Sequence, residues 1–361
     1  MRWLRWPRVE AILAACLVVV TVLPLTLRGA PPGCPAAPEP DPPSTWPPEL
    51  PSAPGPRAAP CEANLSAAAL PGFEVLPAGL RALLLRGHCR AFPLRLDPPP
   101  RKCAPPPFLL LAIKSAPAHL GRRQQVRVTW GLERLVAGLP LRRVFLLGSD
   151  PEPARAPRLD RLLQLEAREH GDILQWDFHD TFLNLTLKQV LFLDWLGEHC
   201  PGVSFVFAHT DNMVAFLGDR HPDSHLFTSH LIQGVGPVRA LGSKYFVPEV
   251  VAGRGSVPPY CGGGGLLASR ATLGALRRAA GALRLFPIDD VFLGLCLQRA
   301  GLRPSAHPGV RTAGLPRALA HDPCAHCGLL LVHRVLPWET WLLWDTLHRP
   351  GLRCGRRERG G

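Results

Sequence analysis

The chain has 361 residues, of which 47% are hydrophobic, enough to bury a core and to exclude a wholly disordered protein. Its 42 Pro and 34 Gly exclude a coiled coil or a continuous helical bundle. The net charge of +13 suggests a nucleic-acid partner, but four of the 41 basic residues are Lys and the other 37 are scattered Arg, without a basic block. We therefore expect no nucleic-acid partner, and a positive surface that suits an anionic substrate.

The N-terminus has the pattern of a membrane anchor. Residues 1–10 hold three Arg against one acid, and an uncharged apolar run fills most of residues 11–28. As a helix this run spans roughly 26 Å, close to the hydrocarbon thickness of early secretory membranes. The positive N-terminal flank predicts a cytosolic tail (1–10), a signal-anchor transmembrane helix (11–28) and a luminal remainder, which is the type II arrangement. A cleaved signal peptide is the alternative.

The segment after the anchor is rich in proline, with thirteen in residues 30–60, and it predicts an extended stem. We assign residues 29–105 to this stem and the segment next to the domain, and residues 106–361 to a luminal domain. Ten Cys follow the apolar run and predict disulfides in an oxidising lumen, although the sequence leaves their pairing open. The tripeptides that begin at Asn64 and Asn184 match N-glycosylation sites, which agrees with a luminal position.

From residue 108 onward, short apolar runs alternate with helical segments. The predicted elements follow in this order: strand 108–113, helix 121–136, strand 143–148, helix 158–170, strand 172–177, helix 181–200 and strand 203–208. Strands separated by helices in this way are typical of a parallel sheet covered on both faces. Ligands of such α/β sheets bind beyond the carboxyl ends of the strands. No strand is followed by a GxGxxG or P-loop motif, so the sequence predicts neither of those nucleotide sites.

Three features of the second half are candidates for chemistry. Asp289 and Asp290 precede an apolar helical run, where adjacent acids either cap the helix or, near the interior, serve as a general base. The glycine run at 261–265 either lets the backbone approach a ligand closely or forms a flexible turn. His333 closes an apolar strand and is either structural or a metal ligand. The CxxC at 324–327 has no second ligand pair, so we expect no zinc site there.

Ordered blocks of the chain resemble glycosyltransferase family 31: KSAPAHLGRRQQVRVTWG (114–131), VFLLG (144–148), the run 172–190, SKYFVPE (243–249), PPYCGGGG (258–265), FPIDDVFLGLCL (286–297) and LLLVHR (329–334). The similarity is greatest to the β1,3-N-acetylglucosaminyltransferase group, and within it to the members that extend core 1 O-glycans. It runs from about Cys61 to Cys354. The resemblance implies the A-type glycosyltransferase fold, a Rossmann-like and mostly parallel sheet with helices on both faces. It also implies a type II protein of the Golgi membrane.

The resemblance also implies an activity and a set of site residues. The activity is the inverting transfer of N-acetylglucosamine from UDP-GlcNAc, in β1,3 linkage, to a galactose-terminated glycan acceptor, with Mn2+ or Mg2+ as cofactor. Core 1 O-glycans are the first expected acceptor and poly-N-acetyllactosamine ends the second. The matching motifs give Asp290 as the catalytic base and His333 as the metal ligand. They also give these substrate-binding residues: Lys114, Arg123, Arg127, Tyr260, Gly262, Gly263, Gly264 and Asp289.

The chain departs from the family pattern at one place. The family has an aspartate cluster after the fourth strand that binds the metal and the diphosphate, but here the strand 203–208 runs directly into HTDN at 209–212. A lone His333 is a poor site for a divalent cation that takes several oxygen ligands. Two hypotheses follow. Either the chain is an active transferase, because the sequence lacks a stretch that the protein has or because His209 or Asp211 substitutes for the cluster, or it is an inactive family member that binds glycans or partner transferases.

Overall fold

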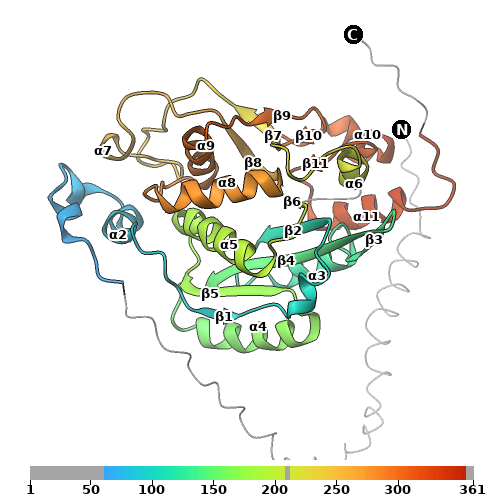
Figure 1. Cartoon of the computed structure of the whole chain (residues 1–361), viewed down its shortest axis with the longest axis horizontal. Helices are drawn as coiled ribbons and strands as arrows, with labels where there is room; N and C mark the ends of the chain where they lie inside the picture. Colours follow the sequence, from blue (N-terminus) through green and yellow to red (C-terminus); the bar gives the residue numbers. More distant parts are fainter. Residues whose placement is uncertain (1–60, 208–211, 355–361) are drawn as a thin grey trace, which may run out of the picture. The chain divides into compact units, whose positions relative to one another are not determined.

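The computed structural model describes residues 61–207 and 212–354 (Figure 1). The predicted tail, anchor helix and most of the stem lie outside these residues, as do His209 and Asp211. Among the described residues, no helix combines the length and the apolar character needed to cross a membrane. The chain separates into two units after residue 55, and every described residue belongs to the second unit, residues 56–361.

A large mixed sheet lies at the centre of this unit (Figure 1). Its strands are ordered β1 (Leu94–Leu96), β5 (Ile173–His179), β4 (Leu139–Ser149), β2 (Leu109–Lys114), β6 (Phe205–Phe207), β8 (Tyr260–Ser269), β7 (Phe227–Ile232) and β9 (Ser305–Ala306), with β3 (Arg134–Val136) alongside β4. The strands β5, β4, β2 and β6 are parallel to one another. In contrast, β1, β3 and β8 are antiparallel to their neighbours. The sheet therefore contains both parallel and antiparallel strands, whereas the sequence predicted a mostly parallel sheet.

Continuous apolar runs explain the four central strands. β2, β4, β5 and β6 confirm the strands predicted from those runs. Successive side chains of a strand point to opposite faces of the sheet. Leu110 accordingly packs into a core on one face, whereas Leu109 and Leu111 pack into a second core on the other. Because both faces are covered, a polar residue at these positions loses its contact with water and needs a partner in the protein, and most residues of the four strands are apolar.

Helices cover both faces of the sheet. The face of Leu110 is covered by α5 (Leu185–His199), α8 (Arg270–Gly281), α9 (Asp289–Arg299) and α2 (Ala78–Arg86). The opposite face is covered by α3 (Leu120–Val128), α4 (Ala156–His170) and α6 (Asn212–Leu217). The helices predicted at 158–170 and 181–200 are confirmed as α4 and α5. The shorter or peripheral helices are η1 (Leu65–Ala69), η2 (Phe73–Val75), η3 (Pro100–Lys102), η4 (Phe182–Asn184), α7 (Glu249–Ala252), η5 (Arg317–Leu319), α10 (Pro323–His326) and α11 (Pro337–Leu347).

The strand order reverses at β2. The chain runs from β2 to β4 and β5 on one side of β2, and then returns to place β6 on the other side. In α/β sheets, ligands bind beyond the carboxyl ends of the strands at such a reversal. Lys114 is the last residue of β2, so it stands at this edge of the sheet.

The helix predicted at 121–136 is shorter than expected. α3 ends at Val128, and the chain turns back through Gly131, where a Cβ would lie 2.4 Å from the side chain of Val126. The rest of the segment forms β3, which pairs with β4 through a tight turn. Ala137 and Gly138 occupy that turn with positive φ values of 50° and 80°, as two-residue hairpin turns require.

Residues before 106 belong to the folded unit. Phe73, Leu76 and Leu80 are buried in the same core as the central strands, and β1 pairs with β5. Disulfides Cys61–Cys89 and Cys103–Cys200 fix this segment to itself and to the end of α5. The compact unit therefore begins well before residue 106, which the sequence had given as the start of the luminal domain.

Candidate active site

An ion pair joins the end of β2 to the start of α9. The Lys114 ammonium donates to the carboxylate of Asp289, the first residue of α9, with 2.5 Å between Nζ and Oδ2. Burial raises the pKa of the Asp289 carboxyl, but the charge and hydrogen bond of Lys114 and the backbone N–H groups of the helix start outweigh it, and the pKa lies below its ordinary value. Asp289 is therefore an ionised carboxylate at neutral pH, held in place by Lys114.

Asp290, the next residue, stands against the start of β8. Burial raises the pKa of the Tyr260 hydroxyl, and the negative charge of Asp290 raises it further. Burial also raises the pKa of the Cys261 thiol to about 12, again with a contribution from Asp290. One turn along α9, a Cβ on Gly294 would lie 2.8 Å from Cβ of Tyr260. The helix and the strand are in direct contact, which brings the predicted base and the predicted sugar-binding residues together.

The glycine run is part of a strand and not a loop or a flexible turn. β7 pairs with β8 through backbone groups, from Ile232 and Tyr260 to His230 and Gly262. A Cβ on Gly262 would lie 2.6 Å from Cδ1 of Ile232. Gly263 follows it in the strand. The close contact explains why this position of the strand accepts only glycine without movement of a neighbour.

His333 lies beside the same strand. It follows β11 (Leu331–Val332), which pairs with β10 (Val310–Arg311), and its backbone N–H donates to the Arg311 carbonyl. A Cβ on Gly264, whose φ is +110°, would lie 2.9 Å from Cδ2 of the His333 ring. The imidazole is exposed. The structure thus confirms that His333 closes a short strand, and it places the ring against the glycine run.

The described residues do not form a site for a divalent cation. Within 61–207 and 212–354, the group of three metal-binding side chains within reach of one ion consists of Cys61, His88 and Cys89. Cys61 and Cys89 form a disulfide, so they are not thiolate ligands. Asp290 and His333 are not part of any such group in this portion of the chain.

Arg123 and Arg127 lie in buried ion pairs below the surface of the site. Arg123 is 1% exposed and binds both carboxylate oxygens of Glu166 at 2.8 and 2.7 Å. Arg127 is 4% exposed and binds both oxygens of Asp172 at 2.9 and 2.7 Å. These contacts correct the expectation that the two guanidinium groups line a nucleotide site. Arg123 also donates to the Ala116 carbonyl at 2.7 Å, so it supports the loop after β2.

A second lysine pair, which was not predicted from the sequence, lies at the strand ends. Lys188 in α5 donates to the carboxylate of Asp180 and to the carbonyl of Ser115, both at 2.8 Å. A signal was present in the sequence, because Lys188 is one of four Lys in the chain and interrupts an apolar helix. A charged residue at a buried helix position requires a partner.

The two predicted glycosylation sites differ in their surroundings. Asn64 is exposed before η1, and its side chain accepts a hydrogen bond from the Ser66 N–H. Asn184 is half-buried and donates to the His179 carbonyl at 2.8 Å. Thr186, the third residue of that site, is buried and donates to the Phe286 carbonyl. Asn64 is thus the more accessible of the two in the folded chain.

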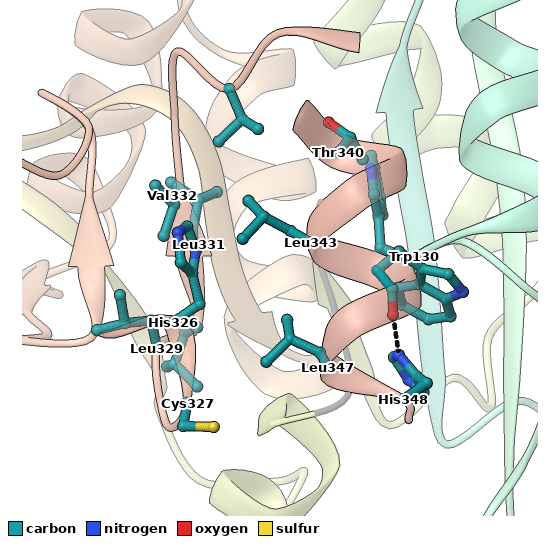
Figure 2. Close-up of a pocket in the computed structure, with 13 residues that line it drawn as sticks. Trp130, His326, Cys327, Leu329, Leu331, Val332, Thr340, Leu343, Leu347 and His348 are labelled. Carbon is teal, nitrogen blue, oxygen red and sulfur yellow. Dashed lines mark hydrogen bonds between the residues drawn. The ribbon is translucent and has the colours of Figure 1, made fainter. Parts of the chain in front are cut away.

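An apolar pocket of about 260 Å3 lies elsewhere, between α11 and the segment before His333 (Figure 2). Leu343 and Leu347 of α11 point toward Leu329 and Val332, with Trp130 at the other side of the helix (Figure 2). None of the described residues that line it is Asp, Glu, Lys or Arg. The pocket therefore supplies neither a carboxylate base nor a cation for a diphosphate, and the charged group of Lys114, Asp289 and Asp290 is the better candidate for the active site.

Known proteins resemble the chain over most of its length. Residues 121–308, more than half of the chain, match the family model Galactosyltransferase. Human N-acetyllactosaminide beta-1,3-N-acetylglucosaminyltransferase 3 is 52% identical over 374 positions, covering 99% of each chain. Mouse acetylgalactosaminyl-O-glycosyl-glycoprotein beta-1,3-N-acetylglucosaminyltransferase is 53% identical, over 84% of this chain and 81% of its own. Mouse UDP-GlcNAc:betaGal beta-1,3-N-acetylglucosaminyltransferase 7 is 40% identical, over 80% and 76%.

The family model and these relatives all carry the names of sugar transferases. The first match extends over more positions than the 361 residues of this chain, so part of that relative stands opposite gaps in this chain. The similarity nevertheless covers nearly all of both proteins. The chain therefore belongs to the galactosyltransferase family, glycosyltransferase family 31.

Proposed function

We propose that the chain transfers N-acetylglucosamine from UDP-GlcNAc, in β1,3 linkage, to a galactose of a glycan acceptor. The names of the relatives support this donor and linkage. The observation that carries the proposal is the position of Asp290, next to the Lys114–Asp289 pair and against the start of β8. This position lies where an α/β sheet binds its ligands. We further propose that the mixed sheet is an A-type glycosyltransferase fold.

The proposed reaction is a single displacement. The O3 atom of the acceptor galactose forms a bond to the anomeric carbon of N-acetylglucosamine while the bond from that carbon to the β-phosphate oxygen breaks, and UDP leaves with that electron pair. Attack from the face opposite UDP inverts the anomeric centre. The O3 proton passes to the carboxylate of Asp290. We assign the proton to Asp290 and not to Asp289, because the pair with Lys114 lowers the pKa of Asp289 and makes it a weaker base.

The remaining residues bind and orient the substrates in this proposal. Lys114 offers positive charge at the edge of the sheet where the diphosphate would lie. Tyr260 and the glycines of β8 form the wall beside Asp290, and a strand without side chains lets a sugar ring approach the backbone closely. Arg123 and Arg127 act indirectly, by holding α3 and the loop after β2 against the sheet.

A divalent cation, when bound in a glycosyltransferase, takes up charge on the leaving diphosphate. The described residues of this chain do not fit such a cation: His333 offers one imidazole nitrogen beside Gly264, and no group of three ligands forms around it in this portion. His209 and Asp211 lie outside the described residues. We therefore assign no step of the reaction to Mn2+ or Mg2+.

We propose that the chain is a type II protein of the Golgi membrane with its catalytic domain in the lumen. The three disulfides Cys61–Cys89, Cys103–Cys200 and Cys324–Cys354 support an oxidising compartment. The apolar run at residues 11–28 supplies the proposed anchor. The exposed side chain of Asn64 supports glycosylation at that site, and Asn184 is the second proposed site.

A transfer assay on the full chain tests the proposed function. The chain is supplied with UDP-GlcNAc and, in separate reactions, with a core 1 acceptor and an N-acetyllactosamine acceptor, each with Mn2+ and each with a chelator. We expect β1,3 transfer, and faster transfer to core 1, because two of the similar relatives are named for O-glycosyl-glycoprotein acceptors. Absence of transfer to both acceptors, under both metal conditions, favours the alternative of an inactive member that binds glycans or partner transferases.

A further inference from the structure

Lys188 is a buried cation at the carboxyl edge of the sheet. It lies in α5, and its side chain is 1% exposed. Its ammonium donates to the carboxylate of Asp180 and to the backbone carbonyl of Ser115, the residue after β2, both at 2.8 Å. A buried ammonium with a carboxylate and a carbonyl as acceptors has a fixed position, because losing either contact would leave a charge without a partner in a medium of low polarity.

Asp180 extends this contact to two further strands. It follows β5, and its carboxylate accepts a hydrogen bond from the Gly148 N–H in β4 at 2.9 Å. Its own N–H donates to the Ser149 carbonyl at 2.8 Å. The pair of Asp180 and Lys188 thus connects the carboxyl ends of β2, β4 and β5, which are three neighbouring strands.

The pair lies next to the Lys114–Asp289 pair of the candidate active site. Burial lowers the pKa of Lys188, and so does the positive charge of Lys114. The negative charges of Asp180 and Asp289 raise this pKa. The four charges therefore interact, as two adjacent lysine–carboxylate pairs. Two ammonium groups so placed repel each other, and each is directed toward its own carboxylate.

We propose that Lys188 is a positioning residue for the transfer reaction. It holds the end of β2 in place through Ser115 and directs the ammonium of Lys114 toward Asp289, so that the start of α9 presents Asp290 to the substrates. The inference rests on the proposed function of this same site. Lys188 itself touches no reacting atom in this account.

Lys188→Met keeps the length of the side chain and removes its charge. The carboxylate of Asp180 then attracts Lys114, which leaves Asp289. We expect kcat to fall by about a hundredfold, the cost of a displacement of about 1 Å in an active site, with a smaller change in KM for UDP-GlcNAc. Hydrogen exchange of the amides in residues 114–120 should become faster, because the Ser115 carbonyl has lost its donor.

Lys102→Met is the matched control. Lys102 is also buried, 5% exposed, and pairs with Glu133 at 2.7 Å in the loop before β3. Both variants lose a buried lysine–carboxylate pair, so both should lower Tm. Only Lys188→Met should in addition lower kcat and make hydrogen exchange in residues 114–120 faster. Equal kcat values in the two variants, or unchanged exchange in that segment, would overturn the proposal.

The double variant Asp180→Asn with Lys188→Met tests the role of the charges. It leaves no buried carboxylate to attract Lys114, so kcat should recover by about tenfold over Lys188→Met, a coupling typical of neighbouring charged residues. No recovery would contradict the charge-based part of the account. If Lys188→Met does not fold, Lys188→Arg serves instead: it keeps the charge but alters the contact with Ser115, and wild-type kcat and exchange in that variant would overturn the proposal.

All variants are prepared as the full chain in detergent. Hydrogen exchange does not depend on turnover. Absence of transfer by the wild-type chain would therefore contradict the proposed function, while the exchange of residues 114–120 in Lys188→Met would still decide whether Lys188 holds the end of β2.

Discussion

At the scale of single residues, a buried network of charges surrounds Asp172, the residue before β5. Asp172 accepts hydrogen bonds from Arg127 and from Arg143, whose Nε lies 2.8 Å from Oδ2. Burial raises the pKa of Asp172, but the two arginines outweigh it, and the pKa lies below its ordinary value. The folded chain therefore favours the ionised carboxylate of Asp172. This preference stabilises the fold at every pH at which the carboxyl group is also ionised in the unfolded chain.

Asp172→Asn should destabilise the protein at neutral pH by about 3–5 kcal/mol, because two buried arginines lose their shared carboxylate. The lowered pKa means that the stabilisation is complete above the unfolded pKa of about 3.9 and is lost as the pH falls through the folded pKa. The Tm difference between wild type and variant should therefore be large at pH 7 and should narrow below about pH 4. Asp223→Asn, in an exposed pair with Arg270, is the control. Equal Tm values for the wild type and Asp172→Asn at pH 7 would contradict this explanation.

Sequence motifs do not show which way side chains point. In the structure, Asp290 and His333 both lie beside β8, the strand that holds the glycine run. Arg123 and Arg127 stand in a matching block of sequence, yet their partners Glu166 and Asp172 lie some 40 residues away in the chain and were invisible to a local pattern. Contacts of this kind depend on tertiary packing, which no single motif encodes.

At the scale of elements, the contact between α9 and β8 positions the proposed base. Gly294 lies one turn after Asp290, and a Cβ there would meet Cβ of Tyr260 at 2.8 Å and the Pro259 carbonyl oxygen at 2.9 Å. The absence of a side chain lets the helix lie directly on the strand. The separation between the start of α9, which holds Asp290, and β8 is therefore set by a glycine.

Gly294→Ala should move α9 away from β8 and reduce kcat by about a hundredfold, since a displacement of about 1 Å has that cost in active sites. Gly281→Ala, at the end of α8, is the matched control, because a Cβ there meets nothing within 4 Å. Steady-state kinetics of both variants, with Tm measured alongside, give the comparison. A Gly294→Ala variant with wild-type kcat would show that the contact does not position Asp290.

The elements that the sequence predicted well are those with strong local patterns. β2 and β6 are short apolar runs whose burial follows from their composition. The run at 261–265 has no such pattern, because glycine has no preference for strands. It is a strand because β8 pairs with β7. The helix predicted to continue to 136 ends at Val128 because of the close contact at Gly131 and the pairing of β3 with β4. Pairing with a neighbouring strand therefore decided both elements, in a local hairpin for β3 and over a longer separation for β8.

At the scale of the whole molecule, disulfides connect distant parts of the described chain. Cys103 and Cys200 are separated by 97 residues, and the bond joins the segment before β2 to the end of α5. Cys324 pairs with Cys354, so the CxxC at 324–327 is not a zinc site: one of its cysteines is in a disulfide. Cys327 is exposed and forms no disulfide in this structure.

Cys103→Ser should lower the stability by about 4–5 kcal/mol, because the lost bond closes a long loop in the unfolded chain. The variant should show a lower Tm and a lower yield of folded protein. Cys327→Ser is the control and should leave Tm nearly unchanged, since Cys327 forms no disulfide. Equal Tm values for the two variants would contradict the assignment of the Cys103–Cys200 bond and weaken the support for an oxidising compartment.

The central claim is that Asp290 accepts the acceptor proton in a transfer from UDP-GlcNAc. The most direct test compares the transfer rates of the full-length wild type, Asp290→Asn and the exposed control Asp345→Asn on a core 1 acceptor. The account predicts transfer by the wild type and the control, and a fall in kcat of about 10²–10⁴-fold in Asp290→Asn with Tm unchanged, the usual contribution of a general base. Near-normal transfer by Asp290→Asn would contradict the assignment of the base, and no transfer by the wild type would contradict the proposed function.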